Sequence, residues 1–85
     1  MRDLRLTGLD TRWNHSLRSG VNRAGRSPEN ELHLPEPSVS GFHCELHVSE
    51  QSILVKDLDS TNGTFIDGQR IQEALLQPGQ VLKLA

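Results

Sequence analysis

The most constraining feature of the chain is its division into short apolar segments, separated at close intervals by glycine, proline, asparagine, aspartate and serine. In the clearest segment, residues 42–48, polar residues alternate with Phe42, Cys44, Leu46 and Val48. A period of two places these four side chains on one face of a β-strand. Because similar segments recur between turn signals, the sequence predicts an all-β fold, either a sandwich or a barrel.

Further strands are expected on the same grounds. Residues 53–58 are almost continuously apolar, and Asp67-Gly68 separates two apolar segments in the way that a two-residue hairpin turn does. Shorter strands are predicted at residues 3–7, 11–19, 21–25, 32–34 and 81–84. Residues 72–77 are expected to form one helical turn, since the segment is too short for a helix that stands alone.

The size of the chain limits its organisation. Its 85 residues have room for one small domain, which we place at residues 1–85. Cys44 is the only cysteine, which excludes an internal disulfide, and its place on an apolar strand face predicts a small buried residue. With no signal peptide and no apolar run of membrane length, we expect an intracellular, cytoplasmic protein without membrane contact.

Charge is distributed unevenly along the chain. Residues 1–28 carry six arginines and two aspartates, a balance of +4, whereas residues 29–85 carry nine acidic and three basic residues, a balance of −6. A basic segment can meet phosphate or nucleic acid, although a solvated surface is the plainer alternative. The chain has only three aromatic residues, which disfavours a base-stacking surface and makes nucleic acid an unexpected partner.

Two candidate metal sites have ligand spacings that do not fit a metal. A calcium loop of the EF-hand type beginning at Asp57 needs glycine where Asn62 stands and an acid where Gly68 stands. On a strand, His43 and His47 are roughly 13 Å apart, too far to share one ion. The sequence therefore predicts no metal and no cofactor.

Catalysis is also disfavoured. Ser40, His43 and Asp57 contain the side chains of a hydrolase triad, but no nucleophile-elbow sequence surrounds the serine. A β domain of this size offers little room for a substrate pocket. We therefore expect a protein that is not an enzyme.

Two loop segments have the composition of an anion site. Arg26 follows Gly25 at a strand end, and its planar guanidinium can donate two parallel hydrogen bonds to phosphate. Ser40 and Thr61 offer hydroxyl donors, and Asn62 can both donate to and accept from a peptide backbone. The alternative is ordinary turn capping, which these residue types also favour.

Four motifs, taken in order and with their spacing, resemble a forkhead-associated (FHA) domain: Gly25-Arg26, Ser40-x-x-His43, residues 57–68, and Leu76-Gln77-Pro78-Gly79-Gln80. Together they span residues 25–84. The resemblance implies a β-sandwich of about ten to eleven short strands, whose loops at one end bind phosphothreonine peptides. It further implies a signalling module whose partner is a threonine-phosphorylated protein.

The resemblance also assigns roles to individual residues. Arg26 would contact the phosphate or the peptide backbone, and Ser40 and Thr61 would hydrogen-bond the phosphate. Asn62 would hold the peptide main chain and help to set specificity. Structural support of the two loops would come from Gly25, His43 and Gly63.

The chain departs from the family pattern after Ser40. The family commonly has arginine or asparagine there, whereas this chain has Gly41, which removes one expected ligand contact. A charged hydrogen bond of that kind is worth about 1.5–3 kcal/mol. An alternative function is therefore a phosphate-independent interaction or oligomerisation module, with the same fold and a decayed phosphate site at Gly41.

A second departure concerns the last strand. The family continues beyond the equivalent of residues 81–84 with a glycine and a strand beside the first one, whereas this chain stops at Ala85. We therefore expect that strand to be missing or truncated. Residues 3–7 would then form an exposed sheet edge, prone to self-association with another chain.

Overall fold

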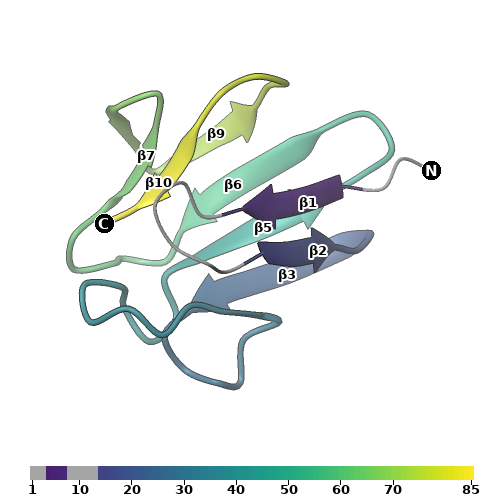
Figure 1. Ribbon diagram of the computed structural model, residues 1–85. Helices are drawn as coiled ribbons and strands as arrows, with labels where there is room; N and C mark the ends of the chain where they lie inside the picture. Colours follow the sequence, from purple (N-terminus) through teal and green to yellow (C-terminus); the bar gives the residue numbers. More distant parts are fainter. Residues whose placement is uncertain (1–3, 8–13) are drawn as a thin grey trace.

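Every regular element of the described residues is a strand. The structure, a computed structural model, describes residues 4–7 and 14–85. Its regular elements are β1 (Leu4–Thr7), β2 (Asn14–Leu17), β3 (Gly20–Gly25), β4 (Leu32–His33), β5 (Cys44–Val48), β6 (Ile53–Asp57), β7 (Thr64–Ile66), β8 (Gln69–Ile71), β9 (Glu73–Leu76) and β10 (Leu82–Leu84) (Figure 1). The predicted all-β fold is confirmed. None of the described residues forms a helix long and apolar enough to cross a membrane.

The largest layer is a five-stranded sheet with the order β4-β3-β5-β6-β9. Neighbouring strands are antiparallel except β3 and β4, which run parallel. On its inner face, Ala24, Cys44, Leu46 and Val55 have no exposed surface. The alternation predicted for residues 44–48 is confirmed. Cys44, Leu46 and Val48 are buried, whereas Glu45 and His47 are only partly buried.

Two smaller sheets close the sandwich. β10, β7 and β8 form a three-stranded sheet, and β1 and β2 form a two-stranded sheet. Both lie on the same side of the five-stranded sheet (Figure 1), since Ile66 of β7, Leu84 of β10 and Leu17 of β2 all pack against its buried cluster. The long connection between β4 and β5 completes the core with Leu34 and Val39.

One hairpin follows directly from its turn residues. Asp67 and Gly68 have φ angles of 50° and 81°, both in the left-handed region that a two-residue turn of this kind requires. β7 and β8 pair on either side of them, with Ile66 opposite Gln69. The hairpin predicted at Asp67-Gly68 is therefore confirmed.

Two sequence predictions are wrong. Residues 72–77 do not form a helical turn, because residues 73–76 pair with β6 and satisfy the hydrogen-bonding groups along its edge. Phe42 does not share the buried face of β5 and is 43% exposed. The strand begins only at Cys44, and the chain before it belongs to a loop in which His43 occupies the buried position.

The first strand was predicted at residues 3–7, and residues 4–7 form β1, paired antiparallel with β2. Residue 3, and residues 11–13 of the second predicted strand, lie outside the described residues. In the part of the chain that the structure describes, β2 is the only strand hydrogen-bonded to β1. Self-association through residues 3–7 stays a prediction.

Cys44 behaves as a core residue. Its side chain has no exposed surface, and burial, aided by the nearby carboxylates of Asp57 and Glu45, raises the pKa of the thiol to about 12. The thiol is therefore protonated at neutral pH, and a protonated thiol is a poor nucleophile. The expectation of a small buried residue is confirmed.

Replacing Leu46 by alanine should lower the free energy of unfolding by about 2–5 kcal/mol, because its fully buried side chain would leave a cavity between the layers. Urea denaturation followed by circular dichroism measures the change. Val81→Ala, at a position that is 41% exposed, is the control and should change stability by no more than about 0.5 kcal/mol. Equal losses in the two variants would contradict this core.

Candidate functional site

Two loops meet at one end of the sandwich. The β4–β5 loop comprises residues 34–43, and the β6–β7 loop comprises residues 58–63. The backbone N–H of Thr61 donates to Ser40 Oγ at 2.9 Å, and the amide of Asn62 donates to the carbonyl of Ser38 at 2.8 Å. The structure thus brings Ser40, Thr61 and Asn62, which the sequence analysis selected separately, into one cluster.

The buried side chain of His43 connects the two loops. Its ring is fully buried, Nδ1 accepts a hydrogen bond from Ser40 N–H at 3.1 Å, and Nε2 lies 2.8 Å from the carbonyl oxygen of Gly63. A backbone N–H can only donate and a carbonyl can only accept, so these partners require a neutral ring with its proton on Nε2. The imidazole therefore sets the separation between Ser40 and Gly63.

The β6–β7 loop is organised around one carboxylate. Asp57 Oδ1 accepts hydrogen bonds from the hydroxyls of Ser60, at 2.5 Å, and Thr64, at 2.6 Å, while Oδ2 accepts from Ser60 N–H at 3.2 Å. Burial by itself would raise the pKa of Asp57, but these hydrogen bonds hold it below its usual value. Ser60 Oγ in turn accepts from Gly63 N–H at 3.1 Å, so the charge of Asp57 fixes the whole turn.

Glycine is required where the β6–β7 loop turns back. Gly63 has a φ of 96°, a conformation that side chains rarely adopt. A Cβ added there would lie 2.9 Å from Nε of Arg70 and 3.1 Å from the ring of Phe65. Any side chain at this position would therefore strain the backbone and displace its neighbours.

Arg26 lies beside the β4–β5 loop. Its backbone N–H donates to the carbonyl of Ser40 at 2.9 Å, and its exposed guanidinium donates one hydrogen bond to the carbonyl of Pro37 at 3.3 Å. Gly25 permits this contact, because a Cβ there would come within 2.3 Å of the carbonyl oxygen of Gly41. The Arg26 side chain is otherwise exposed to solvent.

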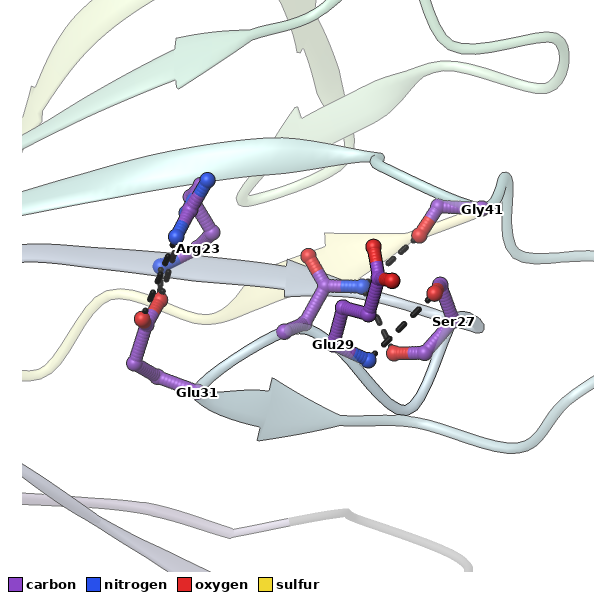
Figure 2. Close-up of polar contacts among 6 residues, drawn as sticks. Arg23, Ser27, Glu29, Glu31 and Gly41 are labelled. Atoms are coloured by element: carbon purple, nitrogen blue, oxygen red, sulfur yellow. Dashed lines mark hydrogen bonds and ion pairs between the residues drawn. The ribbon is translucent and has the colours of Figure 1, made fainter.

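The carbonyl of Gly41 is held from several sides. It accepts hydrogen bonds from Ser27 N–H at 3.1 Å and from the buried amide of Asn30 at 2.8 Å. Ser27 Oγ accepts from Glu29 N–H at 3.3 Å, which closes the turn that carries Asn30 (Figure 2). The turn after β3 therefore anchors the β4–β5 loop.

The cluster presents hydrogen-bond donors to solvent. Ser40 Oγ accepts from Thr61 N–H, which leaves its own hydrogen without an acceptor among the described residues, and the Thr61 hydroxyl likewise has no protein partner there. The guanidinium of Arg26 adds a positive charge. Residues 4–7 and 14–85 contain no group of three or more histidine, cysteine, aspartate or glutamate side chains that could hold a metal. The arrangement is suited to binding an anion.

Known proteins share this sequence pattern. The chain is 39% identical over 70 residues to the FHA domain-containing protein FhaA of Mycobacterium tuberculosis, a match that covers 82% of this chain and 13% of FhaA. It is 34% identical over 84 residues to the ABC transporter ATP-binding/permease protein Rv1747 of the same organism, covering 99% of this chain and 9% of that protein. The chain thus spans a small part of the length of these relatives.

The profile of the FHA domain family matches residues 22–85. The chain belongs to the FHA family. The FHA domain of FhaA, solved in complex with the intracellular domain of Rv3910, superposes with a TM-score of 0.85 at 34% identity, covering 94% of this chain and 88% of that one. A structure from a study of phosphothreonine-dependent FHA domain interactions gives a TM-score of 0.86 at 34% identity, covering 94% and 83%.

Position 41 of this FHA domain is open. Gly41 does not have a left-handed backbone conformation, and a Cβ added there would meet nothing within 4 Å. The main chain of the loop is held by its carbonyl, so the missing side chain is not needed to shape the loop. The lack of a side-chain contact from position 41 to a ligand therefore does not alter the shape of the loop.

Sequence reasoning missed two residues of the FHA site. From the sequence, Asp57 is a candidate calcium ligand, a triad member and part of the motif at residues 57–68, with no role assigned to it in holding the loop. An aspartate followed three residues later by serine is nevertheless typical of a capped turn. Asn30 belongs to none of the four motifs, and its contact with Gly41 spans 11 residues. No local pattern in the sequence indicates such a contact.

Changing Asp57 to asparagine should lower the free energy of unfolding at neutral pH by about 1.5–3 kcal/mol, the value of a charged hydrogen bond. A carboxylate whose pKa is lowered by folding contributes stability that is complete above its unfolded pKa, about 4, and lost as the pH falls through the folded value. The difference between the two proteins should therefore be constant near neutrality and shrink below about pH 4.

Urea denaturation at a series of pH values measures this difference. Asp59→Asn, at an exposed position of the same loop, is the matched control. A difference for Asp57→Asn that stays the same down to the most acidic pH would show that the hydrogen bonds do not depend on the charge.

Proposed function

We propose that this FHA domain is a phosphothreonine-peptide-binding interaction module in signalling. The observation that supports the proposal is the junction of the two loops. Ser40 and Thr61 meet there with hydroxyl hydrogens that have no acceptor among the described residues, and the exposed Arg26 is hydrogen-bonded to the same β4–β5 loop. The similarity to structures of FHA domains in phosphothreonine-dependent interactions, at 34% identity, supports the same ligand class.

The ligand chemistry matches these donors. A phosphothreonine carries a charge of about −1.5 to −2 at neutral pH and three strong acceptor oxygens. Arg26 and the two hydroxyl groups would replace the hydration shell of the phosphate with charge-assisted hydrogen bonds. Because the ring of His43 holds the loops at a fixed separation, little reorganisation is needed on binding.

Asn62 is suited to a different part of the ligand. Its amide nitrogen holds the carbonyl of Ser38, which fixes the orientation of the side chain and leaves Oδ1 to accept from an N–H group. We assign Asn62 to the main chain of the peptide beside the phosphothreonine. Gly25, His43 and Gly63 would act only by shaping the loops.

The mechanism requires binding alone, and we assign no catalytic residue. The site lacks an activated nucleophile, since the buried thiol of Cys44 is protonated and both ring nitrogens of His43 are engaged by backbone groups. We expect the module to act inside the cell, where proteins phosphorylated on threonine occur.

Binding should require the phosphate. In calorimetric titrations with a degenerate peptide library fixed at threonine, the phosphorylated form should bind and the unphosphorylated form should not. Thr61→Val should weaken binding at least about tenfold, because it removes a hydroxyl that has no structural partner, and Arg26→Ala should weaken it by as much or more.

Thr64→Val serves as the control for Thr61, since the hydroxyl of Thr64 is buried against Asp57 and should affect stability more than affinity. Partner binding that survives Arg26→Ala unchanged favours the phosphate-independent module. A steep salt dependence together with indifference to phosphorylation favours nucleic acid instead.

Placing arginine at position 41 should strengthen phosphopeptide binding by about tenfold or more, because the side chain enters open space beside Ser40 and adds a charged donor. The same titrations measure the gain. Gly41→Ala, which adds no donor, should leave affinity unchanged, and Gly41→Glu should reduce it. A gain for alanine equal to that for arginine would mean that loop stiffening, and not a new contact, is responsible.

A further inference from the structure

The outer face of the five-stranded sheet is uncovered. Both smaller sheets pack on its inner face, and no other layer lies over the outer one in the part of the chain that the structure describes (Figure 1). One row of residues crosses this outer face in register from β3 to β9: Val21, His47, Leu54 and Leu75. Val21 is 47% exposed and Leu75 is 49% exposed, so the row presents apolar surface to solvent.

A second row runs parallel to the first, two residues later on β3 and β6 and two residues earlier on the antiparallel strands β5 and β9. It consists of Arg23, Glu45, Lys56 and Glu73, again in register across β3, β5, β6 and β9. The signs of charge alternate across the sheet, as plus, minus, plus, minus. Arg23 also pairs with Glu31 at 3.4 Å, next to β4 and outside the four strands (Figure 2). The guanidinium side chain is still 48% exposed.

Reversing this order of charges gives the opposite sign at every position, so the row is complementary to a second copy of itself turned around. Consider a twofold axis that runs parallel to the strands and passes between β5 and β6. It would place a second copy face to face with the first, with the order of its strands reversed. Each row of one copy would still lie opposite the same row of the other copy. Glu45 would then face Lys56 of the partner, and Arg23 would face Glu73 of the partner. Every charge in the row would meet the opposite charge, and each such pair would occur twice.

The first row, in which His47 also contacts Glu45 of the same chain at 2.9 Å, obeys the same symmetry. Val21 would face Leu75 of the partner, and His47 would face Leu54 of the partner. Glu31 would lie beyond the partner's β9 strand and would meet no charge of the row. Because paired sheets twist, the central strands β5 and β6 would make the closest contacts.

We propose that the outer face of β3, β5, β6 and β9 is the interface of a symmetric homodimer of this chain. Four short strands present less than the roughly 800 Å² per partner of a standard interface, so the dimer is a weak one, with dissociation in the micromolar range or above. The surface is distinct from the loops that carry Arg26, Ser40 and Thr61. Dimer formation therefore does not depend on the proposed peptide binding.

Sedimentation velocity over a range of concentrations tests the interface. The unmodified protein should show reversible dimerisation that increases with protein concentration. Glu45→Lys and Lys56→Glu should each weaken it at least about tenfold, because each replaces two attractive contacts by two repulsive ones. Circular dichroism checks that both variants remain folded.

The decisive measurement is an equimolar mixture of the two variants. In a heterodimer, the lysine introduced by Glu45→Lys in one chain faces the glutamate introduced by Lys56→Glu in the other. The unchanged Lys56 of the first chain faces the unchanged Glu45 of the second. Dimerisation should therefore return to the level of the unmodified protein. Loss of the cross-strand pair within a chain cannot be repaired by mixing, so recovery identifies a contact between chains. A monomer at every concentration, a dimer indifferent to both substitutions, or a mixture that fails to recover would each overturn the proposal.

Discussion

The site depends on the two hydrogen bonds made by one neutral imidazole. The buried ring of His43 links the loops by hydrogen bonds to Ser40 N–H in its own loop and to the carbonyl of Gly63 in the other. The two contacts use opposite roles of the ring, since Nδ1 accepts from a backbone N–H and Nε2–H donates to a carbonyl. The ring is fully buried, so its orientation is set by packing as well as by hydrogen bonds. The exposed donors keep their spacing because this buried ring keeps its place.

The two loops are stabilised by different physical means. The β6–β7 loop is held by the charge of Asp57, which collects three hydrogen bonds from Ser60 and Thr64. The β4–β5 loop is held by backbone contacts that require a glycine at position 25 and by the amide of Asn30. The first loop is therefore sensitive to pH and the second to side-chain volume, although both contribute to the same exposed cluster.

Local patterns in the sequence predict the strands and the turn at Asp67-Gly68, because alternation and left-handed turn residues act over a few neighbours. They fail at residues 72–77, where residues 73–76 pair with the edge of β6 as a strand. They also fail at Phe42, which lies in the loop before the strand and is exposed. Arg26, Ser40, Thr61 and Asn62 could be selected from the motifs of a resembled family. The contact between Thr61 and Ser40 spans 21 residues and depends on how the loops fold together.

Gly41 contributes to the structure of the loop through its carbonyl, which accepts hydrogen bonds from Ser27 and Asn30, and a side chain at this position would meet open space. Shape and recognition are thus divided between two parts of a single amino acid. In such an arrangement, natural selection can alter what the loop binds without risking whether the domain folds. A single substitution at position 41 therefore changes the surface of the loop while the scaffold stays intact.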